Sequence, residues 1–249
     1  MKGLDYSSGR PNLDAVKKAG YGFVCRYASA SSPKGINKVE ADDIRAHGLG
    51  LVLIYESYSN RAKEGRAAGG ADGLTALAQA KLIGFPTSRP IYFAVDWDAT
   101  AGEQPAINEY LKGAAAAIGT GRVGVYGSYA VVERCHANKS AQWFWQTYAW
   151  SAGKISAHTH FLQYKNGQTI GGASVDLNES KQADFGAWTK EVEVIKPVPV
   201  VTPTVVPSKA ELKLIELKII GPGHDVNGVV SWGAMEWTIY RLLQALGKA

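Results

Sequence analysis

Eight short apolar runs recur along residues 1–180, and they limit what this chain can fold into more than any other feature. Each run is rich in β-branched and aromatic residues, and glycine or proline stands beside most of them, as is typical of buried strands. The runs are residues 2–5, 21–27, 50–56, 90–98, 122–126, 143–148, 159–164 and 173–177. With 249 residues, of which 46% are hydrophobic, the chain can bury a core around them.

Helical patterns fill most of the gaps between these runs. They span residues 12–20, 38–47, 65–83, 105–118 and 128–136, and a short closing helix is expected at 184–188. Gly20 and Gly119 stand where helices end, and Pro105 stands where one begins. Alternating strands and helices predict an α/β fold built from parallel units, and eight strands predict a TIM-type (β/α)₈ barrel. A flavodoxin-like open sheet is the alternative.

The composition changes after Trp188. Proline recurs every few residues between Lys196 and Ser208, which favours an extended and semi-rigid chain. We therefore expect a barrel at 1–190, a Pro/Val-rich linker at 191–208 and a small C-terminal α/β segment at 209–249. In that segment, residues 211–220 alternate polar and apolar side chains, and residues 232–246 have helical spacing.

Charge and hydropathy exclude two classes of partner. The formal net charge is +5, but the basic residues are scattered and form no stripe, so we expect no nucleic-acid partner. Diffuse positive charge suits anionic polymers instead. No stretch approaches the roughly 20 apolar residues of a membrane span, so we expect no membrane insertion. Residues 1–6 contain no apolar signal region, so we expect a protein made in the cytoplasm without its own export signal.

Polar residues end most of the strand-like runs, and in a barrel of this type the carboxyl ends of the strands hold the active site. These residues fall into two chemical classes. The carboxylates, taken as catalytic, are Asp5, Glu56, Asp96, Asp98 and Asp176. The residues taken as substrate-binding are Tyr6, Arg26, Tyr27, Trp97, Tyr126, Gln146, Gln163 and Tyr164.

The carboxylates indicate acid catalysis. Asp96 and Asp98 are two residues apart, so strand alternation would place both on one face. Two carboxylates at such a short separation acquire different pKa values, so one can serve as an acid while the other is ionised. Glycoside hydrolysis uses such a pair, and aromatic rings beside it can stack on sugars. An alternative stays open, since Asp176 could cap a turn and Glu56 could pair with Arg26.

Metal and cofactor chemistry finds little support in the sequence. His158 and His160 share one face of a strand, but no third ligand stands near them. Cys25 and Cys135 form neither a metal motif nor a disulfide framework, and Cys25 reads as a buried hydrophobe. We therefore expect no metal and no organic cofactor.

Several segments resemble a known family. These segments are residues 2–29, LIYES at 53–57, FAVDWD at 93–98, VGVYGSY at 123–129, WQTYAW at 145–150, LQYKNG at 162–167 and SVDLNES at 174–180. They resemble the glycoside-hydrolase-like barrel domain of bacterial secreted proteins and phage endolysins, which is related to the family-25 lysozymes. The resemblance covers nearly all of residues 1–188.

The resemblance implies a lysozyme-like N-acetylmuramidase that hydrolyses bacterial peptidoglycan. Asp98 stands where family-25 lysozymes carry a glutamate as general acid, so it would donate the proton. Asp96 would stay ionised, Asp5 and Asp176 would position the sugar, and Glu56 would be an auxiliary carboxylate. The alternative is a module that binds wall glycan without cutting it.

The barrel, linker and tail together also resemble a modular phage endolysin. Such an enzyme would be released from the host cytoplasm to act on the cell wall, and its partners would be peptidoglycan and anionic wall polymers. The tail at 209–249 could dock on the barrel, pair with another chain as an oligomerisation element, or bind the wall. The sequence does not choose among these three.

Overall fold

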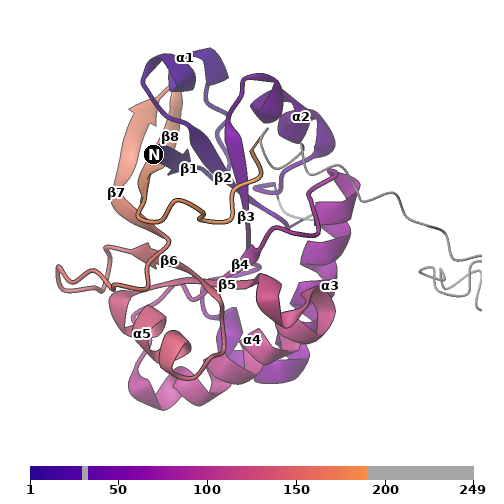
Figure 1. Ribbon diagram of the computed structural model, residues 1–249, viewed down its shortest axis with the longest axis vertical. Coiled ribbons are helices and arrows are strands. Elements are labelled where there is room, and N and C mark those ends of the chain that lie inside the picture. Colours follow the sequence, from indigo (N-terminus) through magenta and orange to yellow (C-terminus); the bar gives the residue numbers. More distant parts are fainter. Residues whose placement is uncertain (30–32, 190–249) are drawn as a thin grey trace, which may run out of the picture. The chain divides into compact units, whose positions relative to one another are not determined.

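A computed structural model describes residues 1–29 and 33–189 of the chain. Eight strands in this part form a closed barrel in chain order, in which β8 returns to pair with β1 (Figure 1). The strands are β1 (Lys2–Asp5), β2 (Phe23–Tyr27), β3 (Gly50–Tyr55), β4 (Ile91–Ala94), β5 (Val123–Gly127), β6 (Trp143–Thr147), β7 (Phe161–Ile170) and β8 (Ala173–Ser180). The predicted barrel is confirmed, and the open sheet is excluded. The predicted linker at 191–208 and segment at 209–249 lie outside the described residues.

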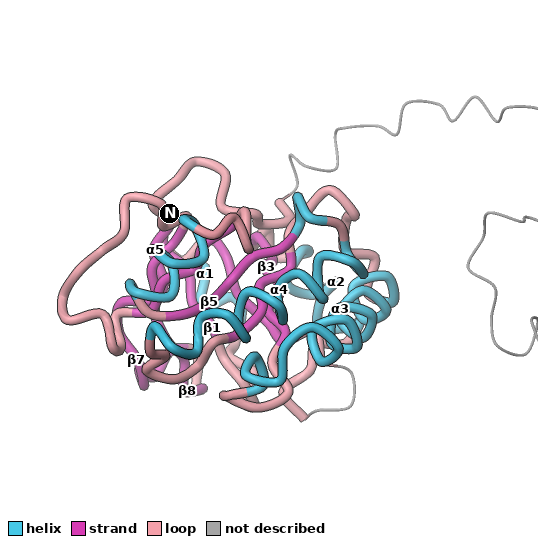
Figure 2. The backbone as a smooth tube through the Cα atoms, turned by 90° about the horizontal axis from the view of Figure 1, so that it is seen from below, coloured by secondary structure: helices cyan, strands magenta, loops and turns pink. Residues whose placement is uncertain are grey.

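Helices follow most of the strands and lie outside them (Figure 2). The α-helices are α1 (Leu13–Lys18), α2 (Lys38–Ala46), α3 (Gly65–Leu82), α4 (Gln104–Ile118) and α5 (Tyr129–Ala137), and the 3₁₀ helices are η1 (Arg61–Glu64), η2 (Ala101–Glu103) and η3 (Thr120–Arg122). The side chains of Asn12, Asn37 and Ser128 each accept a backbone N–H and so begin α1, α2 and α5. Within the described residues, no helix is long and apolar enough to cross a membrane.

The last strand departs from the predicted parallel arrangement. Strands β1 to β7 pair in parallel along the chain, whereas β8 is antiparallel to both β7 and β1. The cause is local, because only Gly171 and Gly172 separate β7 from β8 and both have positive φ, 58° and 82°. A two-residue turn of this kind makes a hairpin, whereas a parallel return needs about a dozen residues or more.

The closing helix predicted at 184–188 is wrong. Trp188 instead forms an isolated antiparallel bridge with Leu51, in which the two backbones exchange N–H···O bonds of 2.7 and 3.0 Å. This segment therefore adds to the barrel wall beside β3. A short helix would have left the backbone of Leu51 without these partners.

Strand alternation divides the buried core into two clusters. One cluster fills the inside of the barrel, where Phe23, Tyr92, Trp145 and Phe161 pack ring against ring. The other lies between the strands and the surrounding helices and contains the alternate strand residues. Cys25 belongs to the inner cluster, which confirms its reading as a small buried hydrophobe. The inner cluster plugs the barrel and forms the floor below its open end.

Candidate active site

Two adjoining cavities open at the end of the barrel where β1 to β6 finish. The inner cavity has a volume of about 150 Å³ and is lined by Asp5, Tyr27, Ile54, Glu56, Ala94, Asp96, Tyr126, Trp145, Gln163, Asn166 and Asp176. The outer cavity, of about 380 Å³, is lined by Asp5 to Arg10, Tyr27 and Gly172 to Asp176. Asp5, Tyr27 and Asp176 line both, so the two cavities share part of their floor.

The antiparallel course of β8 explains how Asp176 reaches this end of the barrel. Asp5 is the last residue of β1, and it pairs in register with Asp176 of β8. The sequence had suggested that Asp176 lies at the end of its strand, but it lies in the first half of β8. Because β8 runs in the opposite direction, its first half lies beside the carboxyl end of β1. Asp176 therefore lies beside Asp5 as predicted, but because β8 is antiparallel and not because Asp176 ends a parallel strand.

Gln163 of β7 links the two aspartates. Its Oε1 accepts hydrogen bonds from Tyr126 Oη at 2.9 Å and from Thr147 Oγ1 at 3.0 Å. These two donors fix the direction of the amide, so its Nε2 donates to Asp5 Oδ2 at 2.9 Å and to Asp176 Oδ2 at 3.5 Å. Gln163 is buried, so this arrangement is held in place before any ligand enters.

A second amide reinforces Asp5 from the opposite side. Asn178 Nδ2 donates to Asp5 Oδ2 at 2.6 Å, and Asn178 Oδ1 accepts from Trp145 Nε1 at 2.9 Å. Asn178, Thr147 and Asn166 were not predicted as site residues. Strand alternation could have indicated Asn178, because it stands two residues after Asp176 and so shares its side of β8.

Burial keeps protons on the carboxyl groups of this site. Asp5 is 6% exposed, and burial, followed by the charge of Asp176, raises its pKa to about 7 despite the amide donors. Burial is also the main cause that raises the pKa of Asp96, with Glu56 adding to it and Lys34 opposing it. Burial raises the pKa of Asp176 as well, against the Gly167 N–H that donates to its Oδ1. The site therefore holds acids that stay protonated above the usual range.

Glu56 lies in the inner cavity but forms a different ion pair from the one considered. Its Oε2 lies 2.5 Å from Lys34 Nζ, and Lys34 also lies over the ring of Tyr27 at 4.5 Å. Arg26, the partner suggested by the sequence, pairs with Glu40 of α2 at 2.6 Å. Lys34 therefore brings one positive charge to the rim of a cavity lined by four carboxylates.

Asp96 and Asp98 are not two positions of one strand. Strand β4 ends at Ala94, so the alternation expected for the pair does not extend to them. Asp96 is half-buried and lines the inner cavity, and its backbone N–H donates to Ser59 O, which holds the backbone in position. Asp98 is exposed and lines neither cavity. Trp97 lines neither as well, and its Nε1 donates to Glu103 at 3.2 Å.

Three predicted substrate contacts lie on the outer side of the barrel wall. Arg26, Gln146 and Tyr164 alternate with residues that face inward, and none of them lines either cavity. Arg26 and Gln146 have no exposed surface, and Gln146 bonds to the loop at 154–159. Strand parity explains the misplacement, because neighbouring residues at a strand end point to opposite sides. Tyr27, Tyr126 and Gln163 have the parity that reaches the cavities.

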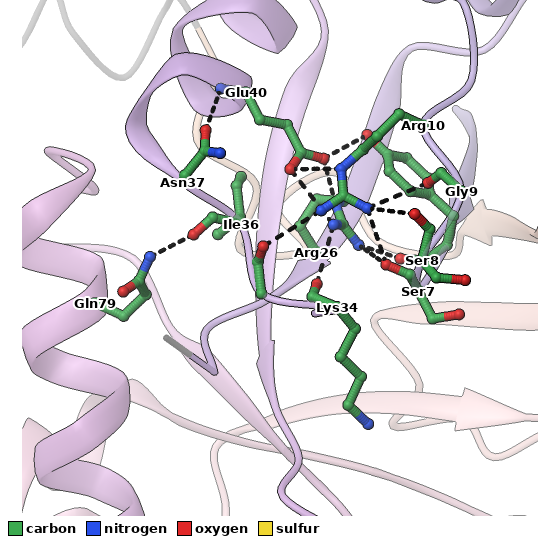
Figure 3. A network of polar contacts seen from close by, with 12 residues as sticks. Ser7, Ser8, Gly9, Arg10, Arg26, Lys34, Ile36, Asn37, Glu40 and Gln79 are labelled. Carbon is green, nitrogen blue, oxygen red and sulfur yellow. Dashed lines mark hydrogen bonds and ion pairs between the residues drawn. The ribbon is translucent and has the colours of Figure 1, made fainter. Parts of the chain in front are cut away.

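Figure 3 shows what Arg26 does instead. Its guanidinium donates to the backbone oxygens of Tyr6, Ser7 and Lys34 and pairs with Glu40. The Tyr6 ring lies 4.2 Å from the same guanidinium, and Tyr6 Oη donates to Glu40. Arg26 therefore shapes the loop after β1, which forms one wall of the outer cavity. Tyr6 lines that cavity, but its hydroxyl is already bonded.

His158 and His160, which both precede β7, form no metal centre in the described part of the chain. His158 stacks on His136, with ring centroids 3.4 Å apart, and His160 Nδ1 accepts from the backbone N–H of Phe144. No group of three side chains suited to a metal ion occurs among the residues that the structure describes.

Comparison with known proteins places this barrel in a family. Residues 14–181 match the Rv2525c-like, glycoside hydrolase-like domain. "Putative peptidoglycan hydrolase Rv2525c" of Mycobacterium tuberculosis is 29% identical over 202 residues, which cover 74% of this chain and 82% of that protein. The crystal structure of this Tat-secreted protein with L-tartrate has a TM-score of 0.72 at 26% identity, covering 76% of this chain and 98% of that one. The modular autolysin LytC from Streptococcus pneumoniae shares the fold, with a TM-score of 0.50 at 17% identity over 71% of this chain and 46% of its own.

The expectation of a cytoplasmic product without an export signal is contradicted by these findings. The mycobacterial relative is a Tat-secreted protein. The expectation relied on the lack of an apolar run in residues 1–6, but residues 2–5 form the first strand of the barrel. Those residues are therefore shaped by the fold and carry no information about export. The family match and the closed barrel agree with each other, and the chain belongs to the Rv2525c-like glycoside hydrolase-like domain family.

Proposed function

We propose that the protein is a peptidoglycan glycosidase whose inner cavity hydrolyses the glycan strand by carboxylate acid catalysis. One observation carries the proposal: Asp5, Glu56, Asp96 and Asp176 line one cavity, and the pKa values of three of them are raised. Glycosidases need one carboxyl group that is protonated and one that is ionised beside the same bond. Buried, mutually repelling carboxylates provide both states.

Asp96 is the general acid in this proposal. It lines the cavity, is only half-buried and so can reach a ligand, and its raised pKa keeps a proton available at mildly acidic pH. Asp98 stood in this role in the sequence-based assignment, but its exposed position outside both cavities favours Asp96. Transfer of the proton to the glycosidic oxygen breaks the bond to the anomeric carbon. Water then supplies the new hydroxyl group there, and an ionised carboxylate of the cavity takes up the proton that the water loses.

In this proposal the remaining carboxylates stabilise positive charge on the sugar and orient the sugar in the cavity. Asp176 and Glu56 line the same cavity as Asp96, so an ionised oxygen of either residue would lie close to the positive charge that develops on the sugar and would lower the barrier. Asp5 accepts two amide N–H bonds on Oδ2, which directs its other oxygen for contact with a sugar hydroxyl. Tyr27 and Tyr126 add aromatic faces on which a sugar ring can stack. These steps need no metal or organic cofactor.

Peptidoglycan is the proposed substrate because the mycobacterial relative is named "Putative peptidoglycan hydrolase Rv2525c", and the match covers 82% of that protein. Anionic wall polymers fit as secondary partners, given the net charge of +5. The modular order of barrel, proline-rich segment and tail also supports an endolysin-like role. That role predicts that the full chain co-sediments with isolated walls more strongly in some bacterial species than in others.

Release of soluble fragments from isolated peptidoglycan tests the proposal. The wild type, Asp96→Asn and Asp98→Asn are compared at equal concentration, after circular dichroism has shown that all three are folded. We expect release by the wild type and Asp98→Asn, and a loss of at least about a hundredfold in Asp96→Asn. Loss in Asp98→Asn alone would return the acid to that residue. Co-sedimentation without any fragments would replace the enzyme with a glycan-binding module.

A further inference from the structure

The wall of the outer cavity differs in charge from the floor that the two cavities share. Four carboxylates line the inner cavity, and one cation, Lys34, is paired with one of them. Arg10 lines the outer cavity, and 39% of its side chain is exposed. A ligand that extends from the inner into the outer cavity therefore moves away from Glu56 and Asp96, keeps the shared floor of Asp5 and Asp176 beside it, and approaches the guanidinium of Arg10.

In the group formed by Arg10, Arg26 and Glu40, positive charge exceeds negative charge. Arg10 Nε and Arg26 Nε both lie against one carboxylate, Glu40, at 2.9 and 2.6 Å (Figure 3). Two guanidinium groups and one carboxylate leave a net charge of +1 in this group. Arg26 is fully buried, whereas Arg10 is partly exposed, so ligands meet the excess charge at Arg10.

Arg10 is also held rigidly in position. Its Nη1 donates to the backbone oxygens of Ser7, Ser8 and Gly9 at 3.1, 2.9 and 3.4 Å, and its Nη2 donates to Gly35 O at 3.3 Å. A guanidinium has five N–H groups. The four backbone contacts and the contact between Nε and Glu40 leave one Nη2 hydrogen of Arg10 without a partner in the described residues. A fixed guanidinium loses little side-chain entropy when an anion binds.

We propose that the outer cavity is a subsite for a sugar unit that carries a carboxylate, and that Arg10 makes the site prefer such acidic glycans to neutral ones. This inference rests on the proposed function, since it assumes that a glycan strand occupies the inner cavity. In peptidoglycan the carboxylate comes from the lactyl group of a muramic acid without a stem peptide, or from the stem peptide where one is attached. The hydroxyls of Ser7, Ser8 and Ser174 line the same cavity and suit the hydroxyl and amide groups of a sugar.

Three soluble ligands of equal length test the preference. They are an N-acetylglucosamine tetramer, a tetramer that alternates N-acetylglucosamine with N-acetylmuramic acid, and the second tetramer with stem peptides attached. Dissociation constants are measured by calorimetry at low and high salt in an Asp96→Asn background, so that the ligands are not consumed. Into this background we introduce Arg10→Gln, Arg10→Lys or the control Arg66→Gln, whose arginine is 65% exposed on α3.

We expect the acidic tetramer to bind about two- to fivefold more tightly than the neutral one at low salt, as for a partly exposed ion pair. Arg10→Gln should abolish this preference, because it lowers the affinity for the acidic tetramer more than the affinity for the neutral one. Arg10→Lys should keep part of the preference, Arg66→Gln should keep all of it, and high salt should weaken it. The stem peptide is joined to the lactyl carboxyl as an amide, so weaker binding with stem peptides would place the recognised carboxylate on the lactyl group, and equal or tighter binding would place it on the peptide.

The two proposals fail in different ways. If the parent binds neutral and acidic tetramers equally, or if Arg10→Gln keeps the preference, the subsite is refuted while the glycosidase proposal stands. If neither tetramer binds and the wild type releases no fragments from peptidoglycan, both proposals are refuted.

Discussion

Replacing Asp5 with asparagine should stabilise the protein at neutral and alkaline pH. Asparagine can keep its carbonyl oxygen where Asp5 Oδ2 accepts from Gln163 and Asn178, and its amide replaces the protonated oxygen. Burial raises the folded pKa of Asp5 from 3.8 to about 7. Because the folded pKa is raised, the favourable contribution of the protonated carboxyl is complete below about pH 4 and is lost as pH rises through about 7.

The magnitude follows from the pKa difference. At 1.36 kcal/mol per unit, the full loss is on the order of 4 kcal/mol, of which roughly 2 to 3 kcal/mol falls between about pH 5 and pH 8. Urea unfolding of the wild type and Asp5→Asn at these two pH values measures it. The variant should gain on the wild type by this amount as the pH rises. A constant difference would refute the reasoning, and Asp42→Asn on the exposed surface of α2 is the control.

Three further changes test the contacts that position the site. Glu40→Gln should lower the free energy of unfolding by roughly 3 kcal/mol, because the fully buried Arg26 loses its counter-charge, and urea unfolding would show it. Trp145→Phe should cost about 1 to 3 kcal/mol, because the buried Asn178 Oδ1 loses its donor; an equal cost for Trp143→Phe, whose indole bond is exposed, would argue against this reason. Gly171→Ala should lower the melting temperature more than Gly167→Ala, because its Cβ would lie 2.7 Å from Asn12 N, whereas the space beside Gly167 is open.

The sequence could predict the parts of the fold that depend on local pattern. Each strand appeared as an apolar run, and the caps at Asn12, Asn37 and Ser128 stand where the helices begin. Asp5 and Asp96 lie at or near the ends of such runs, so the sequence indicated both as candidate site residues. The antiparallel β8 was missed, although Gly171 and Gly172 are the local signal for a hairpin.

Other parts of the site depend on contacts between distant residues. Gln163 meets Asp5 across 158 positions of sequence and Trp145 meets Asn178 across 33, so only closure of the barrel brings them together. The place of Arg26 is set by Glu40, a helix residue that no strand-end argument would select. The alternation of side chains along each strand could have separated the residues that face into the barrel from those that face outward. It could not have placed Asp98, because the chain leaves β4 at Ala94.

The chemistry of the product tests the central claim most directly. Fragments released from purified peptidoglycan are reduced with borodeuteride, which labels reducing sugar ends, and are then examined by mass spectrometry. We predict deuterium-labelled glycan fragments from the wild type at mildly acidic pH, and a large loss of them in Asp96→Asn. Fragments cut only at amide bonds, or labelled fragments that form equally well with Asp96→Asn, would contradict the assignment of this cavity as a glycosidase site.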